Sequence, residues 1–301
     1  MSQAFLLSAV VFYQTLQNSL LLSIPQDGSY NSEIALNENY LYNPQRFQIT
    51  KDTDALAPVI AAKAAIIMDA KTQSILYQKN AHLRLPIASI TKLFTLTTVL
   101  DQNPELSKVI TIDQFAADMP ASKIYLKRGD KVTLYSLLQA SLIASGNDAT
   151  MAIVQGIFGS PATAIEKINT KVQAMGLINT RISNPVGFDD KENYSTAFEV
   201  AKLASLVQKN YPTITDITDS GPITITSELG SRYSIRPTNQ LLSSFIDMRG
   251  LKTGTTNDAG ESFVSLGTYQ GRELITVLLN SPDRFQETKL LYTWATKHYH
   301  W

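Results

Sequence analysis

The chain has 301 residues, of which 44% are hydrophobic and 17% charged, enough for a globular protein with a full hydrophobic core. Its 26 basic and 26 acidic residues leave no net charge, so composition indicates neither a nucleic-acid partner nor an acidic tail. Because the chain contains no cysteine, disulfides, thiolate metal sites and a cysteine nucleophile are excluded, which fits an extracytoplasmic location.

The N-terminal part has an apolar segment, residues 4–23, that is about long enough to span a bilayer. Its centre, residues 14–19, is polar, and no Lys or Arg precedes Arg46, so the basic region of an ordinary signal peptide is missing. We interpret residues 1–25 as a signal peptide or membrane anchor, the alternative being a helix that packs on the protein. Residues 26–56 are rich in Asn, Gln, Ser and Tyr and are interpreted as a linker, which leaves residues 57–301 as one domain.

The pattern of the remaining chain predicts strands, then helices, then strands and a last helix. A β-hairpin is expected first, and a helix from Ser89 to about Leu100 follows. Thr133 is a plausible N-cap for the helix after it. The expected strands are 64–69, 74–77, 109–112, 223–226, 233–235, 263–268 and 274–279; the later helices are 134–138, 151–157, 162–175, 196–208 and one from about 283. This order predicts an α+β fold in which helices flank an antiparallel sheet and a mostly helical lobe is inserted.

Residues 86–94 contain a Ser-x-x-Lys motif at a helix start. Ser89 and Lys92 lie on one face of such a helix, so the hydroxyl and the amine can touch. That pairs a weak oxygen nucleophile with a base, beside the free N–H groups of a helix start. The competing interpretation is a capping serine and a solvated lysine, since roughly one Ser-x-x-Lys is expected by chance in a chain of this length.

Two later motifs decide between these interpretations. Ser145, Gly146 and Asn147 fall at a junction of two predicted helices, where glycine permits a sharp turn. Lys252, Thr253 and Gly254 open the strand that runs towards residue 263, and Gly254 there permits close approach of a ligand. Each motif alone is a modest signal. In this order they match the signature of penicillin-recognising enzymes, and the specificity lies in the combination.

The chain resembles the low-molecular-mass penicillin-binding proteins, the D-alanyl-D-alanine carboxypeptidases of serine peptidase family S11. The resemblance extends over residues 60–298, with matching stretches at 84–92, 145–149, 174–177, 184–187, 194–197, 238–242 and 250–256. It implies a β-lactamase/DD-peptidase-like fold with a catalytic domain at 57–301 and no cofactor or metal. It also implies peptidoglycan stem peptides ending in D-Ala-D-Ala as substrate, β-lactams as inhibitors, and a place in the bacterial cell envelope, secreted or anchored through the N-terminus.

The resemblance also implies a role for each motif residue. Ser89 attacks the carbonyl of the penultimate D-alanine, and Lys92, kept neutral by burial and by the charge of Lys252, accepts its proton. Ser145 and Lys252 pass a proton to the departing amine, and Asn147 holds the substrate amide. The N–H groups of Ser89 and Thr255 form the oxyanion hole. Thr253 and Arg284 bind the terminal carboxylate, although Arg284 could instead be a surface arginine at a helix start.

Other candidates are weaker. His82, His298 and His300 suggest no Ser-His-Asp triad, and the residues 298–300 are expected to be a frayed tail. Glu166 precedes Asn169, but on a predicted amphipathic helix, so it is interpreted as a solvated residue and not as the deacylating glutamate of a class A β-lactamase. Three function classes remain: a DD-peptidase (carboxypeptidase or endopeptidase), a class A-like β-lactamase, and a catalytically silent binding domain.

Overall fold

The computed structural model describes residues 49–301, except residues 121, 243, 246 and 247. The predicted signal peptide or anchor and most of the predicted linker therefore lie outside the described residues. Residues 49–301 form one compact unit. Within them, no helix is both long and apolar enough to cross a membrane.

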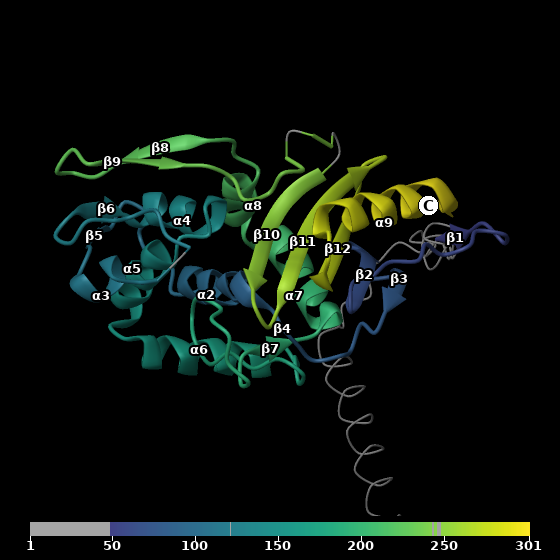
Figure 1. The fold of residues 1–301 in the computed structure, drawn as a ribbon, viewed down its shortest axis with the longest axis horizontal. Helices are drawn as coiled ribbons and strands as arrows, with labels where there is room; N and C mark the ends of the chain where they lie inside the picture. The colour runs from purple at the N-terminus through teal and green to yellow at the C-terminus, as the bar shows by residue number, and fades with distance from the viewer. Residues whose placement is uncertain (1–48, 121, 243, 246–247) are drawn as a thin grey trace, which may run out of the picture. The chain divides into compact units, whose positions relative to one another are not determined.

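A five-stranded antiparallel sheet lies beside the helices of this unit (Figure 1). Its strand order is β10-β11-β12-β2-β3. The bounds are β2 Ala64–Asp69, β3 Ile75–Lys79, β10 Met248–Thr256, β11 Gly260–Tyr269 and β12 Arg272–Ser281. The first hairpin is confirmed as β2 and β3. The expectation that the Lys252 motif opens the strand towards residue 263 is wrong, because a turn at 257–259 makes β10 and β11 two strands of a hairpin.

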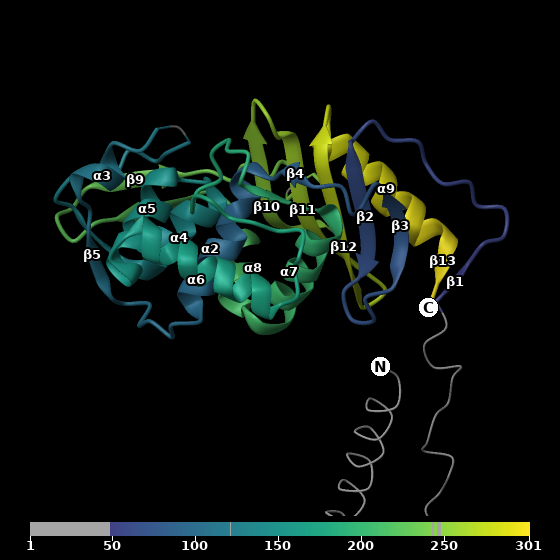
Figure 2. The ribbon, with the colours of Figure 1, turned by 90° about the horizontal axis from the view of Figure 1, so that it is seen from below.

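Alternating side chains of the sheet pack into two separate cores. Ile66 and Met68 belong to the larger core, shared with the helices, whereas Ala65 and Ile67 belong to a second core with Leu291 of α9 (Arg284–His298). Successive strand residues point to opposite faces, so a run of apolar residues such as β2 is buried from both sides. Helix α9 covers one face and α7 (Ala197–Asn210) the other, as Figures 1 and 2 show.

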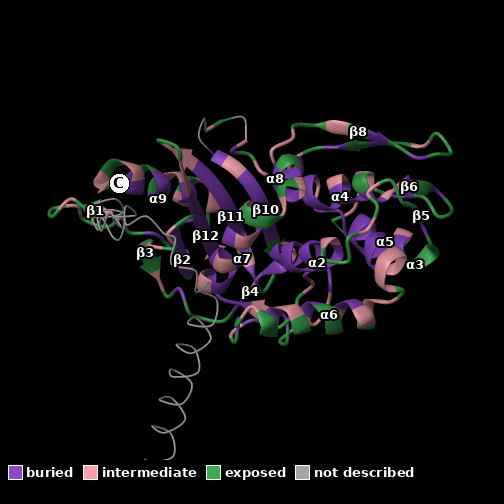
Figure 3. Cartoon of the chain, turned by 180° about the vertical axis from the view of Figure 1, so that it is seen from behind, coloured by how far each residue is buried: buried purple, intermediate pink, exposed green. Residues whose placement is uncertain are grey.

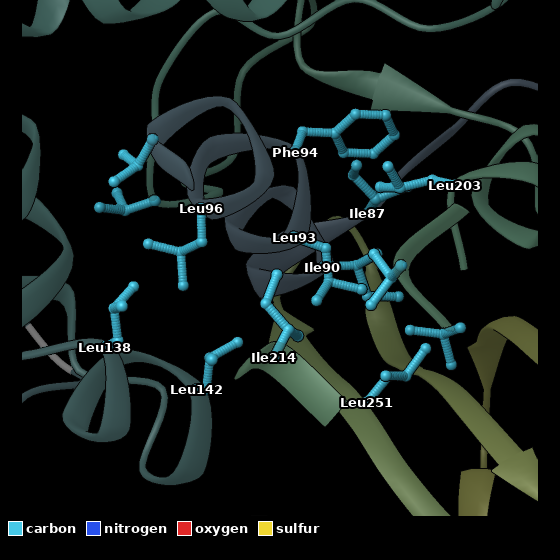
Figure 4. Packing of buried hydrophobic residues seen from close by; sticks show 14 of the residues in the cluster. Ile87, Ile90, Leu93, Phe94, Leu96, Leu138, Leu142, Leu203, Ile214 and Leu251 are labelled. Atoms are coloured by element: carbon cyan, nitrogen blue, oxygen red, sulfur yellow. The ribbon is translucent and has the colours of Figure 1, made fainter. Parts of the chain in front are cut away.

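The segment between β3 and β10 forms the inserted helical lobe. Its central helix, α2 (Thr91–Leu100), has nine of its ten residues buried. The surrounding helices are α3 Gln114–Ala117, α4 Leu134–Ile143, α5 Asn147–Phe158, α6 Pro161–Ala174 and α8 Pro212–Thr218. Side chains from α2, α4, α8 and β10 gather in one core, among them Leu93, Leu142, Ile214 and Leu251 (Figure 4). Figure 3 shows exposed residues on the loops and on outward helix faces, such as that of α6. The predicted α+β architecture with a helical insertion is confirmed.

Short strands and caps complete the lobe. The lobe contains three small two-stranded sheets. They pair β4 Leu85–Pro86 with β7 Tyr194–Ser195, β5 Val109–Thr111 with β6 Lys131–Thr133, and β8 Ile223–Thr226 with β9 Arg232–Ile235. Thr133 caps α4 as predicted, accepting a hydrogen bond from the N–H of Ser136 at 3.2 Å. Helix α8 and the short α3 were not predicted from the sequence.

The C-terminal residues are not frayed. Strand β13 (Tyr299–His300) pairs with β1 (Thr50–Lys51). Asp52 holds both histidines, with Oδ2 2.9 Å from His298 Nδ1 and Oδ1 2.7 Å from His300 Nε2. Residues 49–56, assigned above to the linker, are part of the compact unit, in which Asp52 contacts both histidines at the end of α9.

Candidate active site

The Ser89 turn is enclosed by two glycines. Ser89 lies in a short 3-10 turn, η3 (Ala88–Ile90), which leads into α2, and Ala88 adopts a left-handed φ of 47°. A side chain at Gly187 would collide with the carbonyl of Ala88, and a Cβ at Gly254 would lie 2.9 Å from Ile87 O and 3.1 Å from Ser89 N. Gly254 thus permits close approach of the protein's own backbone.

Lys92 makes three short polar contacts in a fully buried position. Its Nζ lies 2.8 Å from Ser89 Oγ, 2.7 Å from Asn147 Oδ1 and 2.7 Å from the carbonyl oxygen of Val186. Asn147 Oδ1 and the carbonyl can only accept, so they take the two N–H groups of a neutral amine. Its lone pair is then left for the hydroxyl proton of Ser89. The three contacts fit a charged ammonium that donates to all three oxygens, and they also fit a neutral amine that accepts from Ser89.

The surroundings of Lys92 favour its neutral form. Burial is the largest influence and lowers the pKa of Lys92 well below its ordinary value of 10.5, and the charge of Lys252 lowers it further. The carboxylate of Asp148 acts in the opposite direction and raises it. The net effect is a lowered pKa, which favours the neutral form of Lys92, the form that can accept a proton.

Asn147 and Ser145 lie where α4 passes into α5. Ser145 is buried and has a left-handed φ of 58°. Below this turn, the hydroxyls of Ser141 and Thr150 lie 2.6 Å apart and tie the two helices together. The side-chain amide of Asn147 donates to Pro120 O at 3.1 Å, which orients its oxygen towards Lys92.

Strand β10 brings the third motif to the same place. Its Lys252 is buried, and its Nζ donates to the carbonyl of Thr253 at 3.0 Å. Burial, followed by the charge of Arg284, lowers the pKa of Lys252 from 10.5 to about 7. The hydroxyl of Thr253 lies 2.6 Å from that of Thr238, whose N–H donates to Ile143 O at the end of α4. Thr238 therefore links β10 to the turn that carries Ser145.

Arg284 begins α9 and is bound to β10. One guanidinium nitrogen, Nη1, donates to Gly254 O at 2.9 Å and to Thr255 Oγ1 at 2.6 Å. With 12% of its side chain exposed, it is not the free surface arginine considered as the alternative. Its position beside β10 puts a fixed positive charge at the edge of the motif cluster.

The loop at 184–187 has no predicted role, although it is one of the stretches that carry the family resemblance. Asn184 Oδ1 accepts from the N–H groups of Gly187 at 2.8 Å and Phe188 at 2.9 Å. This turn directs the carbonyl of Val186 at Lys92 and places Gly187 against Ala88. A main-chain carbonyl has no residue signature, so only the Asn-Pro-Val-Gly pattern could have indicated it.

The weaker candidates lie apart from this cluster. Glu166 is an exposed residue of α6, as predicted, and Asn169 Nδ2 donates to Ile182 O at 2.7 Å. The ring of His82 packs against Phe198 with centroids 4.8 Å apart. Over the described part of the chain, no group of three or more His, Cys, Asp or Glu side chains could hold a metal ion.

A model of the D-alanyl-D-alanine carboxypeptidase family, Peptidase S11, matches residues 51–283. The chain belongs to this family. It is 34% identical over 248 residues to the D-alanyl-D-alanine carboxypeptidase of Streptomyces strain K15, covering 77% of this chain and 85% of that protein. It is 32% identical over 202 residues to the D-alanyl-D-alanine carboxypeptidase DacF of Bacillus subtilis, covering 66% of this chain. The match covers 52% of DacF, about half its length.

Solved structures of this family have the same fold. The DD-transpeptidase of Streptomyces K15 superposes with a TM-score of 0.76 at 30% identity, covering 80% of this chain and 99% of that one. The D-alanyl-D-alanine carboxypeptidase DacD of Francisella tularensis superposes with a TM-score of 0.74 at 24% identity, covering 85% of this chain and 74% of that one. The predicted DD-peptidase-like fold is confirmed.

Proposed function

We propose that the protein is a serine-type D-alanyl-D-alanine carboxypeptidase that removes the terminal D-alanine from peptidoglycan stem peptides through an acyl-serine intermediate. The observation that carries the proposal is the buried Lys92, whose Nζ faces Ser89 Oγ at 2.8 Å with its other contacts occupied by acceptors. Membership of the carboxypeptidase family supports it.

In the acylation step, Ser89 Oγ attacks the carbonyl of the penultimate D-alanine while its proton passes to Lys92. The carbonyl oxygen becomes an oxyanion, which the N–H groups of Ser89 and Thr255 stabilise. The proximity of β10 to the Ser89 N–H supports this pair. When the C–N bond breaks, the departing D-alanine takes a proton delivered through Ser145 and Lys252. Water then hydrolyses the ester and restores Ser89.

Substrate binding would use groups from both sides of the cluster. We assign the terminal carboxylate to Thr253 and to the charge of Arg284, and the substrate amide to Asn147. The buried cations Lys252 and Arg284 make this side of the site attractive to an anion. The same groups would receive a β-lactam, which presents a strained amide and a carboxylate in place of the peptide terminus.

The substrate class places the protein in the bacterial cell envelope, outside the cytoplasm. We further propose that residues 1–25 export the protein or attach it to the membrane. A fusion of these residues to a reporter enzyme that is active only after export tests that part. An inactive reporter would contradict it.

Two assays on one sample test the activity. Fluorescent penicillin is expected to label the wild type and not Ser89→Ala, as shown by intact mass. A D-Ala-D-Ala pentapeptide is expected to release free D-alanine. The penicilloyl-enzyme should last minutes or longer, because Glu166 faces solvent instead of activating a water. Penicillin hydrolysis at tens per second, an ordinary enzyme turnover, without D-alanine release would instead identify a β-lactamase.

A DD-endopeptidase is the second candidate. D-alanyl-D-alanine endopeptidases of Pseudomonas aeruginosa and Escherichia coli are 29% and 28% identical to this chain. Such an enzyme would use the same acylation chemistry on a D-Ala-containing cross-link. Cross-linked muropeptides compared with the pentapeptide at equal concentration decide between the two. Faster cleavage of the cross-link would overturn the carboxypeptidase assignment.

A further inference from the structure

Asp148 is a buried carboxylate next to the proposed site, with no role assigned to it so far. It is the second residue of α5 and has no exposed surface. Its oxygens accept from the N–H groups of Ile124 at 3.1 Å, Leu126 at 3.0 Å and Ala149 at 2.9 Å. A buried charge is costly unless such donors compensate it, and the N-terminus of α5 adds a favourable dipole.

The segment anchored by Asp148 also holds Asn147. The N–H of Asn147 donates to Ser122 O at 2.7 Å, and its side-chain amide donates to Pro120 O at 3.1 Å. Two bonds from Asp148 fix Ile124 and Leu126, a few residues further along the same segment. If the segment moved, both acceptors of Asn147 would move with it, and so would the oxygen that contacts Lys92.

The Asp148 carboxylate also interacts with Lys92 through its charge. Its negative charge raises the pKa of Lys92, opposing burial and the charge of Lys252 on β10. Arg284 of α9 influences Lys92 only indirectly, because its charge lowers the pKa of Lys252. Removing the Asp148 charge would therefore leave Lys92 neutral down to a lower pH.

We propose that Asp148 is a positioning residue for acylation: by anchoring residues 122–126 it fixes Asn147, and through Asn147 the amine of Lys92, opposite Ser89. This inference rests on the proposed function, since it assigns Lys92 as the base. The inference predicts two separable effects of Asp148 on Lys92: one through the position of residues 122–126, and one through the charge of the carboxylate.

The test compares Asp148→Asn with a matched control, Glu199→Gln. Glu199 is a buried carboxylate on α7 that also anchors a loop, accepting from Asn179 N–H at 2.9 Å and from the Thr180 hydroxyl at 2.5 Å. Both variants lose anchoring bonds and stability. Asp148→Asn is expected to slow acylation by fluorescent penicillin by about tenfold, less than the loss of about a hundredfold or more expected when the base itself is removed. Glu199→Gln is expected to acylate at the wild-type rate.

The pH profile separates positioning from simple destabilisation. In Asp148→Asn, the acidic limb of the acylation rate should move to lower pH, whereas in Glu199→Gln it should stay at the wild-type position. Ile124→Pro removes one N–H donor but keeps the carboxylate, so it should slow acylation without moving the limb. This variant also keeps the test decisive if Asp148→Asn does not fold. Wild-type acylation rates and unmoved profiles in the Asp148 and Ile124 variants would overturn the inference. Failure of the wild type to form any adduct would instead refute the proposed function.

Discussion

A buried charged lysine should cost this protein stability, and Lys252→Met measures that cost. The unfolded chain holds the lysine proton up to about pH 10.5, whereas the folded chain releases it above about pH 7. Between these values the unfolded state binds more protons, so the stability of the wild type rises with pH. A pKa lowered from 10.5 to about 7 corresponds to a cost of about 5 kcal/mol at neutral and acidic pH.

Methionine fills similar space and carries no charge. Lys252→Met is therefore expected to raise the free energy of unfolding most below about pH 7, with about 5 kcal/mol as the upper limit. The gain should shrink by about 1.4 kcal/mol per pH unit above that and fall to about 1 kcal/mol by about pH 10. Loss of the Lys252 charge also eases protonation of Lys92, which adds to the gain at low pH. Acylation should fall in the same variant, since a proposed proton donor is lost.

Urea unfolding followed by tryptophan fluorescence, at about pH 6, 8 and 10, gives the required free energies. Titrating groups other than Lys92, whose pKa responds to the Lys252 charge, cancel in the difference between variant and wild type. The exposed Lys297→Met serves as control, and its effect should be small and independent of pH. If the effect of Lys252→Met differs by less than about 0.5 kcal/mol between the two extreme pH values, Lys252 does not bear a burial cost and the reasoning fails.

Three further predictions test the proposed roles. Lys92→Ala should slow acylation at least about a hundredfold in stopped-flow measurements, and Lys92→Arg nearly as much, because a guanidinium stays protonated; near wild-type acylation by the arginine variant would show that another base operates. Gly187→Ala should lower the melting temperature far more than Gly159→Ala, since both have positive φ but only Gly187 would meet the Ala88 carbonyl; equal shifts would argue against that packing. Arg284→Ala should raise KM for the pentapeptide at least about tenfold, the usual scale of a lost charge-assisted hydrogen bond; an unchanged KM would move the carboxylate site elsewhere.

The sequence was most informative where the chemistry is local. Ser89 and Lys92 are three residues apart and meet within one turn, so their contact followed from spacing alone. The Thr133 cap and most of the longer strands were likewise predicted from short patterns. The division between β10 and β11 was missed although Asn257, Asp258 and Gly260, residue types typical of turns, mark it.

Contacts between distant residues could not be predicted in the same way. Lys92 meets the Val186 carbonyl 94 residues later in the chain, and Arg284 meets Gly254 30 residues earlier. Both contacts use main-chain oxygens, which every residue has, so no residue type indicates them. The same holds for Asp148, whose carboxylate is satisfied entirely by backbone N–H groups in the contacts described above. Such residues become identifiable only when burial and hydrogen-bond partners are known.

The placement of two buried lysines at one site explains how acid and base roles can be divided between identical side chains. When Lys252 holds a proton, its charge favours the neutral form of Lys92, which is the form that can deprotonate Ser89. Repulsion between two charges is reciprocal, so once Lys92 has taken the Ser89 proton, it favours release of the proton from Lys252. With a pKa of about 7, Lys252 is poised to make that transfer at neutral pH. In the proposed mechanism, the first proton transfer thus prepares the second, and the site needs no histidine to work at neutral pH.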